Sequence, residues 1–525
     1  MTQSDPQFTP QLQLDVLRRR AKQLRRDYLA GLPVAHQRLK QHPPRALGTV
    51  LQHADFLHVI AQEQNFASWP ALKLAAETIG LDRASRVQRL KLAVAQGQVR
   101  VIAHLLGETP DLATGFLGLQ IALYDKAAVQ AALWENPLAA VQKLGPKTPI
   151  LHLCFSRWIH ARPDLEQDML DIAEMLRGLG ADVNDSMPVG PQNPHPLSAL
   201  YGAIGHADNM PLAAWLLQNG ADPNDGESLY HATELGHRHG LKLLLDHGAK
   251  PAGTNALLRA LDFGDLAAVQ MLIAAGADVN EFQAAPVGGE APIVIPALHQ
   301  AARRMCDAPL IETLLAAGAD LERTYQGGTA YAYARVFGNR AVAQAIENRT
   351  AAPLAVTLTK EEALLAKAAD GMATEGAFLN PDQLPEAYRN IIAEILHLPG
   401  KAEHVRHLVA LGVEFDRPNS EGLTPVQLAG WEGLPDMLAL LLGLGPDLAH
   451  VNTYGGTLLS TIIHGSENCP QRAERDYIAC LELVLHHGVA LPERDITSAG
   501  DETVAAFLSD WAARYPGQVV EAITG

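Results

Sequence analysis

The sequence predicts an all-α solenoid of stacked helix–turn–helix units with a small helical domain at its N-terminus. A motif that ends a helix recurs along the 525 residues, with full Gly-Ala-Asp-x-Asn forms at 180–184, 220–224 and 276–280. Shorter versions of this stop stand at Gly248, Gly318, Gly412, Gly445 and Gly488. The composition is 48% hydrophobic but only 5% aromatic, which suits close packing of helices with small side chains. Helix pairs this short cannot bury their apolar faces alone, so the pattern indicates that each pair stacks on the next.

Residues 1–84 are expected to form the N-terminal helical segment, which begins with an amphipathic helix over residues 11–30. Leu17 and Leu24 fall on its apolar face, and five Arg and Lys side chains point away from that face. Two interpretations of the basic face stay open. It is an arm that touches an acidic partner or a membrane surface, or a solvated face packed on the domain behind it. A second helix is expected to end near Asn65.

The segment ahead of the repeats, residues 59–73, contains the run Asn-Phe-Ala-Ser-Trp-Pro. It resembles a segment often found before the repeats of bacterial ankyrin-repeat proteins, which commonly has the sequence Ala-Arg-Glu-x-Gly-Phe-x-Ser-Trp-Pro-x-Leu. Gln62 replaces the Arg of that pattern, and Asn65 replaces its Gly. Asn still suits a left-handed helix stop, and Ser68 can cap a helix that Pro70 enters in its first turn.

The repeats are expected from about residue 85 to residue 516. Residues 419–429 resemble the Gly-x-Thr-Pro-Leu-His-x-Ala opening of ankyrin repeats, with Gln427 at the His position. In that opening the Thr hydroxyl can cap the helix, and Pro fits the first turn. The resemblance covers about four fifths of the chain and implies an ankyrin-repeat solenoid of bacterial type, shaped as a drawn-out arc. It also implies a protein–protein interaction module, in which inner helices and loop tips line a concave groove.

Residues 353–384 interrupt the repeat register. Thr359-Lys360-Glu361-Glu362 has the form of a capping box, which predicts a helix through Ala369, and a loop follows. The spacer from Asp185 to Pro196 holds four prolines and shows neither a strand nor a helix period. The domains expected after residues 1–84 are a first stack over 85–352, an insert with one helix and a loop over 353–384, and a second stack with a C-terminal cap over 385–525.

The formal charge of −17 is unevenly distributed along the chain. Residues 1–100 carry 15 Lys and Arg against 7 Asp and Glu, so the remaining residues hold a net charge of −25. An acidic body disfavours general nucleic-acid binding, which depends on neutralising phosphates. Four cysteines without a Cys-x-x-Cys motif suit a reducing compartment, and no apolar run approaches the roughly 18 residues of a membrane helix. We expect a cytoplasmic monomer that does not insert into membranes.

No sequence-local catalytic motif is visible, because the chain lacks Gly-x-Ser-x-Gly, P-loop, Gly-x-Gly-x-x-Gly and His-Glu-x-x-His sequences. The densest histidine clusters, at 152–160 and 486–487, lack the spacing of a closed zinc site. We therefore expect no enzymatic activity, no catalytic residues, no cofactor and no metal. Two other hypotheses stay open. One is an effector or enzyme whose activity lies in residues 1–84 or 353–384, and the other is a masking partner whose acidic face mimics nucleic acid.

The expected binding surface consists of the concave face and the loop tips that follow the Gly stops. Exposed Phe, Tyr and Arg side chains concentrate binding energy at protein interfaces. The alternative is that the aromatic rings pack on a neighbouring tip. The predicted partner-binding residues at the tips are Phe282, Arg323, Tyr325, Arg417 and Tyr454.

Overall fold

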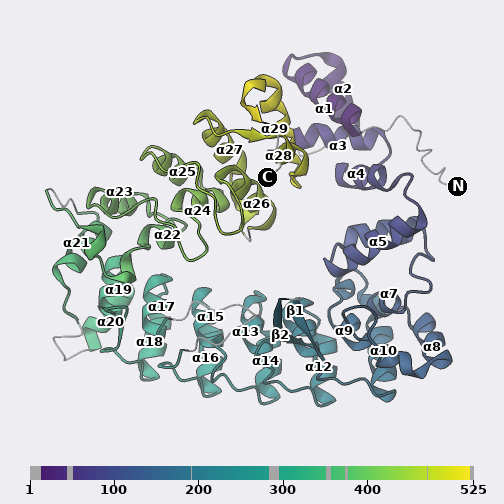
Figure 1. The fold of residues 1–525 in the computed structure, drawn as a ribbon, viewed down its shortest axis with the longest axis horizontal. Coiled ribbons are helices and arrows are strands. Elements are labelled where there is room, and N and C mark those ends of the chain that lie inside the picture. Colours follow the sequence, from purple (N-terminus) through teal and green to yellow (C-terminus); the bar gives the residue numbers. More distant parts are fainter. Residues whose placement is uncertain are drawn as a thin grey trace.

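The computed structural model is mostly helical, as the sequence predicts, and its helices follow one another around a curved array (Figure 1). Among the residues that the structure describes, no helix is long and apolar enough to cross a membrane. The described residues are 14–43, 51, 53–190, 192–282, 295–349, 356–372, 376–469 and 471–520.

In the described part of the N-terminal segment there are four helices: α1 (Leu14–Leu29), α2 (Pro33–Gln41), α3 (His53–Glu63) and α4 (Trp69–Thr78). The start of the predicted 11–30 helix lies outside the described residues, and α2 was not predicted. Leu17 and Leu24 of α1 are buried in an apolar cluster separate from the core of the repeats. Asn65 ends α3 with a left-handed φ of 63°, and Ser68 caps α4 by accepting a hydrogen bond from the Ala71 N–H at 3.4 Å.

Pairs of helices make up the repeats, and each pair packs on the next. Along most of the array the first helix of a pair lies on the inner side of the curve and the second on the outer side (Figure 1). The first helices are α5 (Arg83–Ala95), α7 (Leu117–Ala122), α9 (Pro149–Cys154), α11 (Ala199–Tyr201), α13 (Ser228–His231), α15 (Ala256–Asp262), α17 (Ala297–Arg303), α19 (Ala330–Phe337), α21 (Lys360–Ala369), α24 (Pro425–Trp431), α26 (Leu458–Asn468) and α28 (Glu493–Ser498). The second helices are α6 (Val99–Glu108), α8 (Lys126–Glu135), α10 (Glu166–Gly178), α12 (Met210–Gln218), α14 (His239–Asp246), α16 (Leu266–Ala274), α18 (Ala308–Ala316), α20 (Arg340–Arg349), α23 (Ala402–Ala410), α25 (Pro435–Leu442), α27 (Tyr477–His486) and α29 (Glu502–Arg514), and the short α22 (Ile391–Ile395) precedes α23.

The recurring Gly-Ala-Asp-x-Asn motif both ends a helix and joins neighbouring repeats. Gly180, Gly220 and Gly276 have φ values of 97°, 95° and 93°, a left-handed conformation that favours glycine. The motif's Asn184 donates to the Gly220 carbonyl at 3.1 Å and accepts from the Asp222 N–H at 2.7 Å. Asn280 makes the same two bonds, to the Gly318 carbonyl at 2.9 Å and from the Asp320 N–H at 2.8 Å. The final Asn of one stop therefore sets the position of the next stop.

Within the described ranges, three two-stranded sheets interrupt the helical array. The spacer after Asp185, for which no strand was predicted, folds into an antiparallel hairpin of β1 (Ser186–Gly190) and β2 (Asn193–Ser198). Its prolines are tolerated because Pro188 pairs with Pro196 in a ribbon of only two strands, where a missing N–H costs little. The other pairs are β3 (Thr324–Tyr325) with β4 (Gly328–Thr329), antiparallel, and β5 (Leu491–Pro492) with β6 (Val519–Val520), parallel.

Part of the segment 353–384 stacks as a repeat helix. Helix α21 begins with a capping box, in which the Thr359 N–H donates to Glu362 at 2.9 Å and the Glu362 N–H donates to Thr359 at 3.1 Å. It packs against both α19 and α23, and Leu365 and Ala368 belong to the same apolar cluster as the repeats on either side. Residues 353–355 and 373–375 lie outside the described residues.

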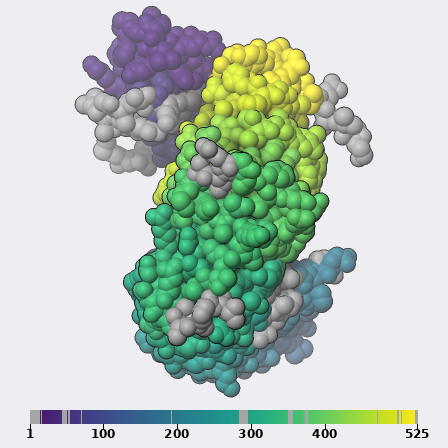
Figure 2. All heavy atoms as spheres, turned by 90° about the vertical axis from the view of Figure 1, so that its left-hand side faces the viewer, coloured from purple at the N-terminus to yellow at the C-terminus, as the bar shows by residue number. Residues whose placement is uncertain are grey.

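The two ends of the array meet, whereas the sequence predicted an open, drawn-out arc. Lys22 Nζ of α1 lies 2.6 Å from Asp510 Oδ1 of α29, and α29 packs against α3. Figure 2 shows the N-terminal helices beside the C-terminal ones at one end of the molecule. The helices therefore trace an almost closed ring, in which an acidic side chain of the same chain faces the predicted basic helix.

Candidate functional site

Three of the predicted contact residues lie together on two neighbouring tips. The rings of Phe282 and Tyr325 meet edge to face with their centroids 6.2 Å apart, and the Arg323 guanidinium lies 5.7 Å from the Phe282 ring centroid. All three side chains are half-buried. Edge-to-face pairs and cation–π contacts of this kind stabilise a packed cluster.

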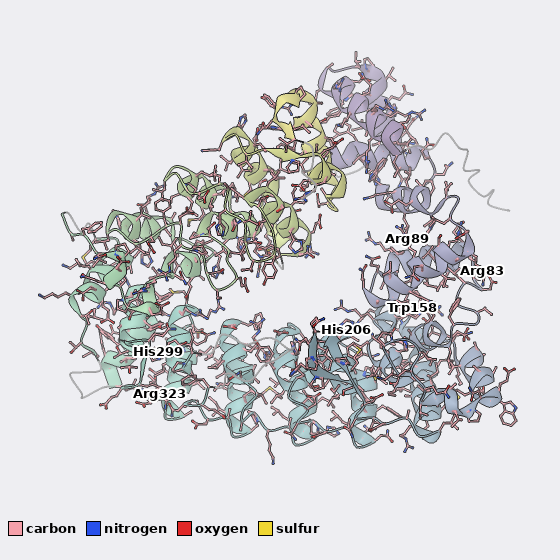
Figure 3. The ribbon with its side chains drawn as sticks, viewed as in Figure 1. Arg83, Arg89, Trp158, His206, His299 and Arg323 are labelled. Atoms are coloured by element: carbon pink, nitrogen blue, oxygen red, sulfur yellow. The ribbon has the colours of Figure 1, made fainter. Side chains whose placement is uncertain are left out.

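Further contacts fix this tip cluster, defined as Phe282, Arg323 and Tyr325, onto the inner helices. Arg323 Nη1 donates to the Asn280 carbonyl at 2.7 Å. The Tyr325 ring packs on His299 of α17, with 6.2 Å between the ring centroids. His299 and Arg323 lie near each other on this part of the ring in Figure 3. The three side chains thus join neighbouring repeats and still present part of their surface to solvent.

The remaining two predicted residues lie apart from the tip cluster. Arg417 Nη1 lies 3.4 Å from Glu414 Oε2, within the same turn. Tyr454 is 76% exposed and lines a pocket of about 780 Å³ between α24, α26 and α28. Asn452 holds the turn of Tyr454, because its Oδ1 accepts from the Tyr454 N–H at 3.0 Å and from the Gly456 N–H at 2.9 Å.

A polar network along the inner helices begins at the β1–β2 hairpin and was not predicted. The side chain of Glu227 is 1% exposed and pairs with His195 of β2 and with His231 Nε2, the latter at 3.1 Å. His231 Nδ1 lies 2.7 Å from Glu234 Oε2. Burial alone would lower the pKa of His231, but its bonds to the two carboxylates raise that pKa to about 9. His231 is therefore a cation at neutral pH.

The same network continues through the next two repeats. Arg259 of α15 donates from Nε to Glu234 at 2.8 Å and from Nη1 to Asp262 at 2.9 Å. Asp262 also accepts from Arg304 Nε at 2.9 Å. The residues of this network come from successive repeats and are far apart in the sequence. The one signal that they share in the sequence is position: each lies on the first helix of a pair or close to it. Satisfied networks of this kind hold neighbouring elements in one arrangement.

The thiols of the chain are buried, and burial disfavours the reactive thiolate form of two of them. All four cysteines are free and buried, and burial raises the pKa of Cys306 and of Cys480 to about 12. Because the thiolate is the reactive form, these thiols are poor nucleophiles and poor metal ligands. Within the described ranges, no three His, Cys, Asp or Glu side chains converge as a metal site requires.

Comparisons with known proteins match part of the chain. A family model described as "Ankyrin repeats (3 copies)" matches residues 200–283, which begin within α11 and include α12 to α16. No curated protein matches the chain. Among solved structures, the crystal structure of the human ASB11 ankyrin repeat domain is 21% identical, with 48% of this chain and 96% of that chain covered and a TM-score of 0.24.

Proposed function

Because this chain is an all-α protein that contains ankyrin repeats, we propose that it is a non-enzymatic adaptor that binds another protein. Ankyrin repeats are in general protein–protein interaction modules, and stacked repeats offer a long continuous surface for a partner. The binding surface in this proposal is the inner face of the ring together with the loop tips that bear the predicted residues.

One observation carries this proposal: packing and hydrogen bonds hold partly exposed aromatic and Arg side chains at the tips of the array. The tip cluster is fixed by Asn280 and His299, and Tyr454 stands on a turn fixed by Asn452. Side chains that are ordered before binding lose little conformational entropy when a partner docks. Aromatic and Arg side chains in such positions are the usual hot spots of an interface.

The test begins with affinity capture from the native host and mass spectrometry to identify the partner. Binding of the purified partner is then measured for the Phe282→Ala, Arg323→Ala, Tyr325→Ala triple variant and for Tyr454→Ala. We expect affinity to fall by about thirtyfold or more, since truncating a hot spot costs roughly 2 kcal/mol or more. Circular dichroism checks that the variants keep their helices.

Trp134→Ala is the matched control, because Trp134 is 88% exposed on α8, away from the tip cluster and from Tyr454. The control variant should bind the partner normally. If the triple variant and Tyr454→Ala both keep full affinity while folded, or if only Trp134→Ala loses it, the proposed binding face is wrong.

Three properties belong to the same proposal: a cytoplasmic location, a monomeric state and a bacterial type of ankyrin-repeat protein. Four free, buried thiols support a reducing compartment. The Asn65 helix stop and the Ser68 cap give the N-terminal segment the local structure that its resemblance implies. The contact between Lys22 and Asp510 supports a monomer, because it joins the two ends of one chain.

A further inference from the structure

The pocket beside Tyr454 combines acidic and aromatic side chains on the inner side of the array. It lies between the first helices α24 and α26 and the start of α28, and its volume is about 780 Å³. Figure 1 shows these three helices on the inner side of the ring. The lining residues that carry the argument are Glu421, Trp431, Glu432, Tyr454, His464 and Asp495.

Asp495 is an unusual residue in this wall, because it is 6% exposed and its Oδ2 is buried without a hydrogen-bond partner in the part of the chain that the structure describes. Its other oxygen, Oδ1, lies 3.4 Å from Arg494 Nε. Burial raises the pKa of Asp495. An unsatisfied buried carboxylate oxygen costs free energy, and a positive charge in the adjoining pocket would offset that cost by electrostatic attraction.

Glu432 is a second carboxylate of the same pocket. Burial raises its pKa, and Arg475 Nη2 lies 3.6 Å from its Oε2. Glu421 adds a third acidic side chain at the exposed edge. Three ionised acids, set against Arg494 in the lining and Arg475 behind Glu432, leave a net charge of −1 at this site.

Aromatic rings form the rest of the wall. The Trp431 ring packs on His464 with 5.2 Å between the ring centroids. Tyr454 stands at the edge of the pocket, where most of its surface is exposed. A cation within about 6 Å of a Trp or Tyr face is attracted by the ring, and most strongly where water is excluded. The aromatic part of the wall therefore favours the same kind of ligand as the acidic part.

We propose that this pocket binds a side-chain cation, the guanidinium of arginine or the ammonium of lysine, from the protein partner. The carboxylates of Asp495 and Glu432 would pair with the charge, while Trp431 and Tyr454 would cover the aliphatic stem. This inference rests on the proposed adaptor function, because it names the chemistry of one anchor that the partner inserts.

The test measures binding of N-acetyl-arginine methylamide and N-acetyl-lysine methylamide to the full chain by saturation-transfer NMR and calorimetry. The control ligand is N-acetyl-citrulline methylamide, which has nearly the shape of the arginine probe but no charge. We expect at least one cationic probe to bind about tenfold more tightly than the citrulline probe, because the neutral ligand leaves the carboxylates unpaired. Equal binding of the charged and neutral probes would overturn the proposal.

The variant Asp495→Asn separates a binding role from a structural one. We expect this variant to bind the cationic probe with about tenfold lower affinity. The melting temperature of the free protein should stay the same or rise, because no unpaired carboxylate remains buried. Asp436→Asn, the same change at an exposed position of α25, should bind the probe normally. A folded Asp495→Asn variant that keeps full probe affinity would contradict the proposal. If this variant fails to fold, Glu432→Gln replaces it, with the same expected loss.

The two proposals fail in different ways. If neither cationic probe binds but the triple tip variant loses its protein partner, the pocket inference is wrong and the adaptor function stands. If the probe binds through Asp495 but neither the triple variant nor Tyr454→Ala affects partner binding, the pocket binds cations and the adaptor face is wrong.

Discussion

His299 of α17 shows how burial sets the charge of a single residue in this protein. The side chain has no exposed surface, and its Nε2 donates to the Gly328 carbonyl at 3.1 Å. Burial lowers the pKa of His299 to about 4, so the ring is neutral at physiological pH. Its neutral ring also packs on Tyr325 of the tip cluster, which links its protonation to the proposed binding surface.

The lowered pKa of His299 predicts acid sensitivity. The pKa of His299 is about 4 in the folded protein and about 6.5 in the unfolded chain, so the unfolded chain binds a proton first as the pH falls. The contribution of neutral His299 to stability is therefore present above pH 6.5 and is lost as the pH falls toward 4. His299→Gln should therefore lose less stability than the parent between pH 7 and pH 4.5, by on the order of 2 kcal/mol. Urea unfolding at the two pH values measures the difference. His486→Gln, at an exposed position, is the control, and a parent-like pH dependence in His299→Gln would contradict the prediction.

At the scale of the elements, the close approach of α24 and α26 depends on a glycine. Gly465 of α26 faces the backbone of Trp431 at the end of α24, and an added Cβ would overlap the Trp431 carbonyl group. Trp431 cannot move freely, because the same carbonyl accepts a hydrogen bond from the Tyr477 hydroxyl at 2.9 Å. The part of the Tyr454 pocket wall that contains Trp431 is therefore fixed by the close contact between the backbones of α24 and α26.

We expect Gly465→Ala to destabilise the protein by about 1–3 kcal/mol, because α24 and α26 must separate to accommodate the methyl group. Gly178→Ala in α10 is the matched control, since no atom lies within 4 Å of the added Cβ and alanine favours helix by up to about 1 kcal/mol. Chemical denaturation measures both variants. Equal or greater stability of Gly465→Ala would show that the two helices are not in close contact.

The sequence predicted that an insert over residues 353–384 divides the array into two stacks, and the packing of α21 within this insert bears on that prediction. The boundaries at 353 and 384 stay a prediction, because helix packing alone does not establish domains. The apolar cluster runs without interruption from Val87 through Leu365 to Trp511, which favours cooperative unfolding across this segment. The N-terminal helices have a separate apolar cluster, so we expect them to unfold independently of the repeats.

At the scale of the whole molecule, the ring is closed by the Lys22–Asp510 ion pair and by the packing of α29 against α3, which join two separate apolar clusters. Lys22 and Asp510 are partly exposed, at 22% and 31% of their side-chain surface, and such pairs contribute about 1 kcal/mol or less. Lys22→Glu should therefore open the ring and increase the radius of gyration in small-angle scattering. Adding Asp510→Lys to that variant should restore closure, and high salt should open the parent by screening the pair.

Lys242→Glu is the matched control for the ring, because it reverses the charge of an ion pair within α14 and touches neither end of the array. It should leave the radius of gyration unchanged. If the Lys22→Glu variant and the parent have the same radius of gyration at low salt, the Lys22–Asp510 pair does not hold the ends together.

The sequence alone determined the repeat class of this protein and much of its local structure, although α2 and the β1–β2 hairpin were missed. Gly180 and Gly220 end helices because glycine adopts the left-handed conformation at low cost, and Thr359 with Glu362 starts one through short-range bonds. Such signals act within a few residues, so they are visible without the fold. They also located the loop tips and placed Phe282, Arg323 and Tyr325 there, but they left open whether the rings pack on a neighbouring tip, as the structure shows.

The tertiary structure decided everything that depends on residues distant in the sequence. The meeting of Lys22 with Asp510 results from small rotations between successive repeats, which add up over the array and leave no local pattern. The same is true of the network from Glu227 to Arg304 and of the pocket that joins Trp431 with Asp495. Local preferences fix where each helix begins and ends, whereas the curvature of the stack determines which side chains face each other across it.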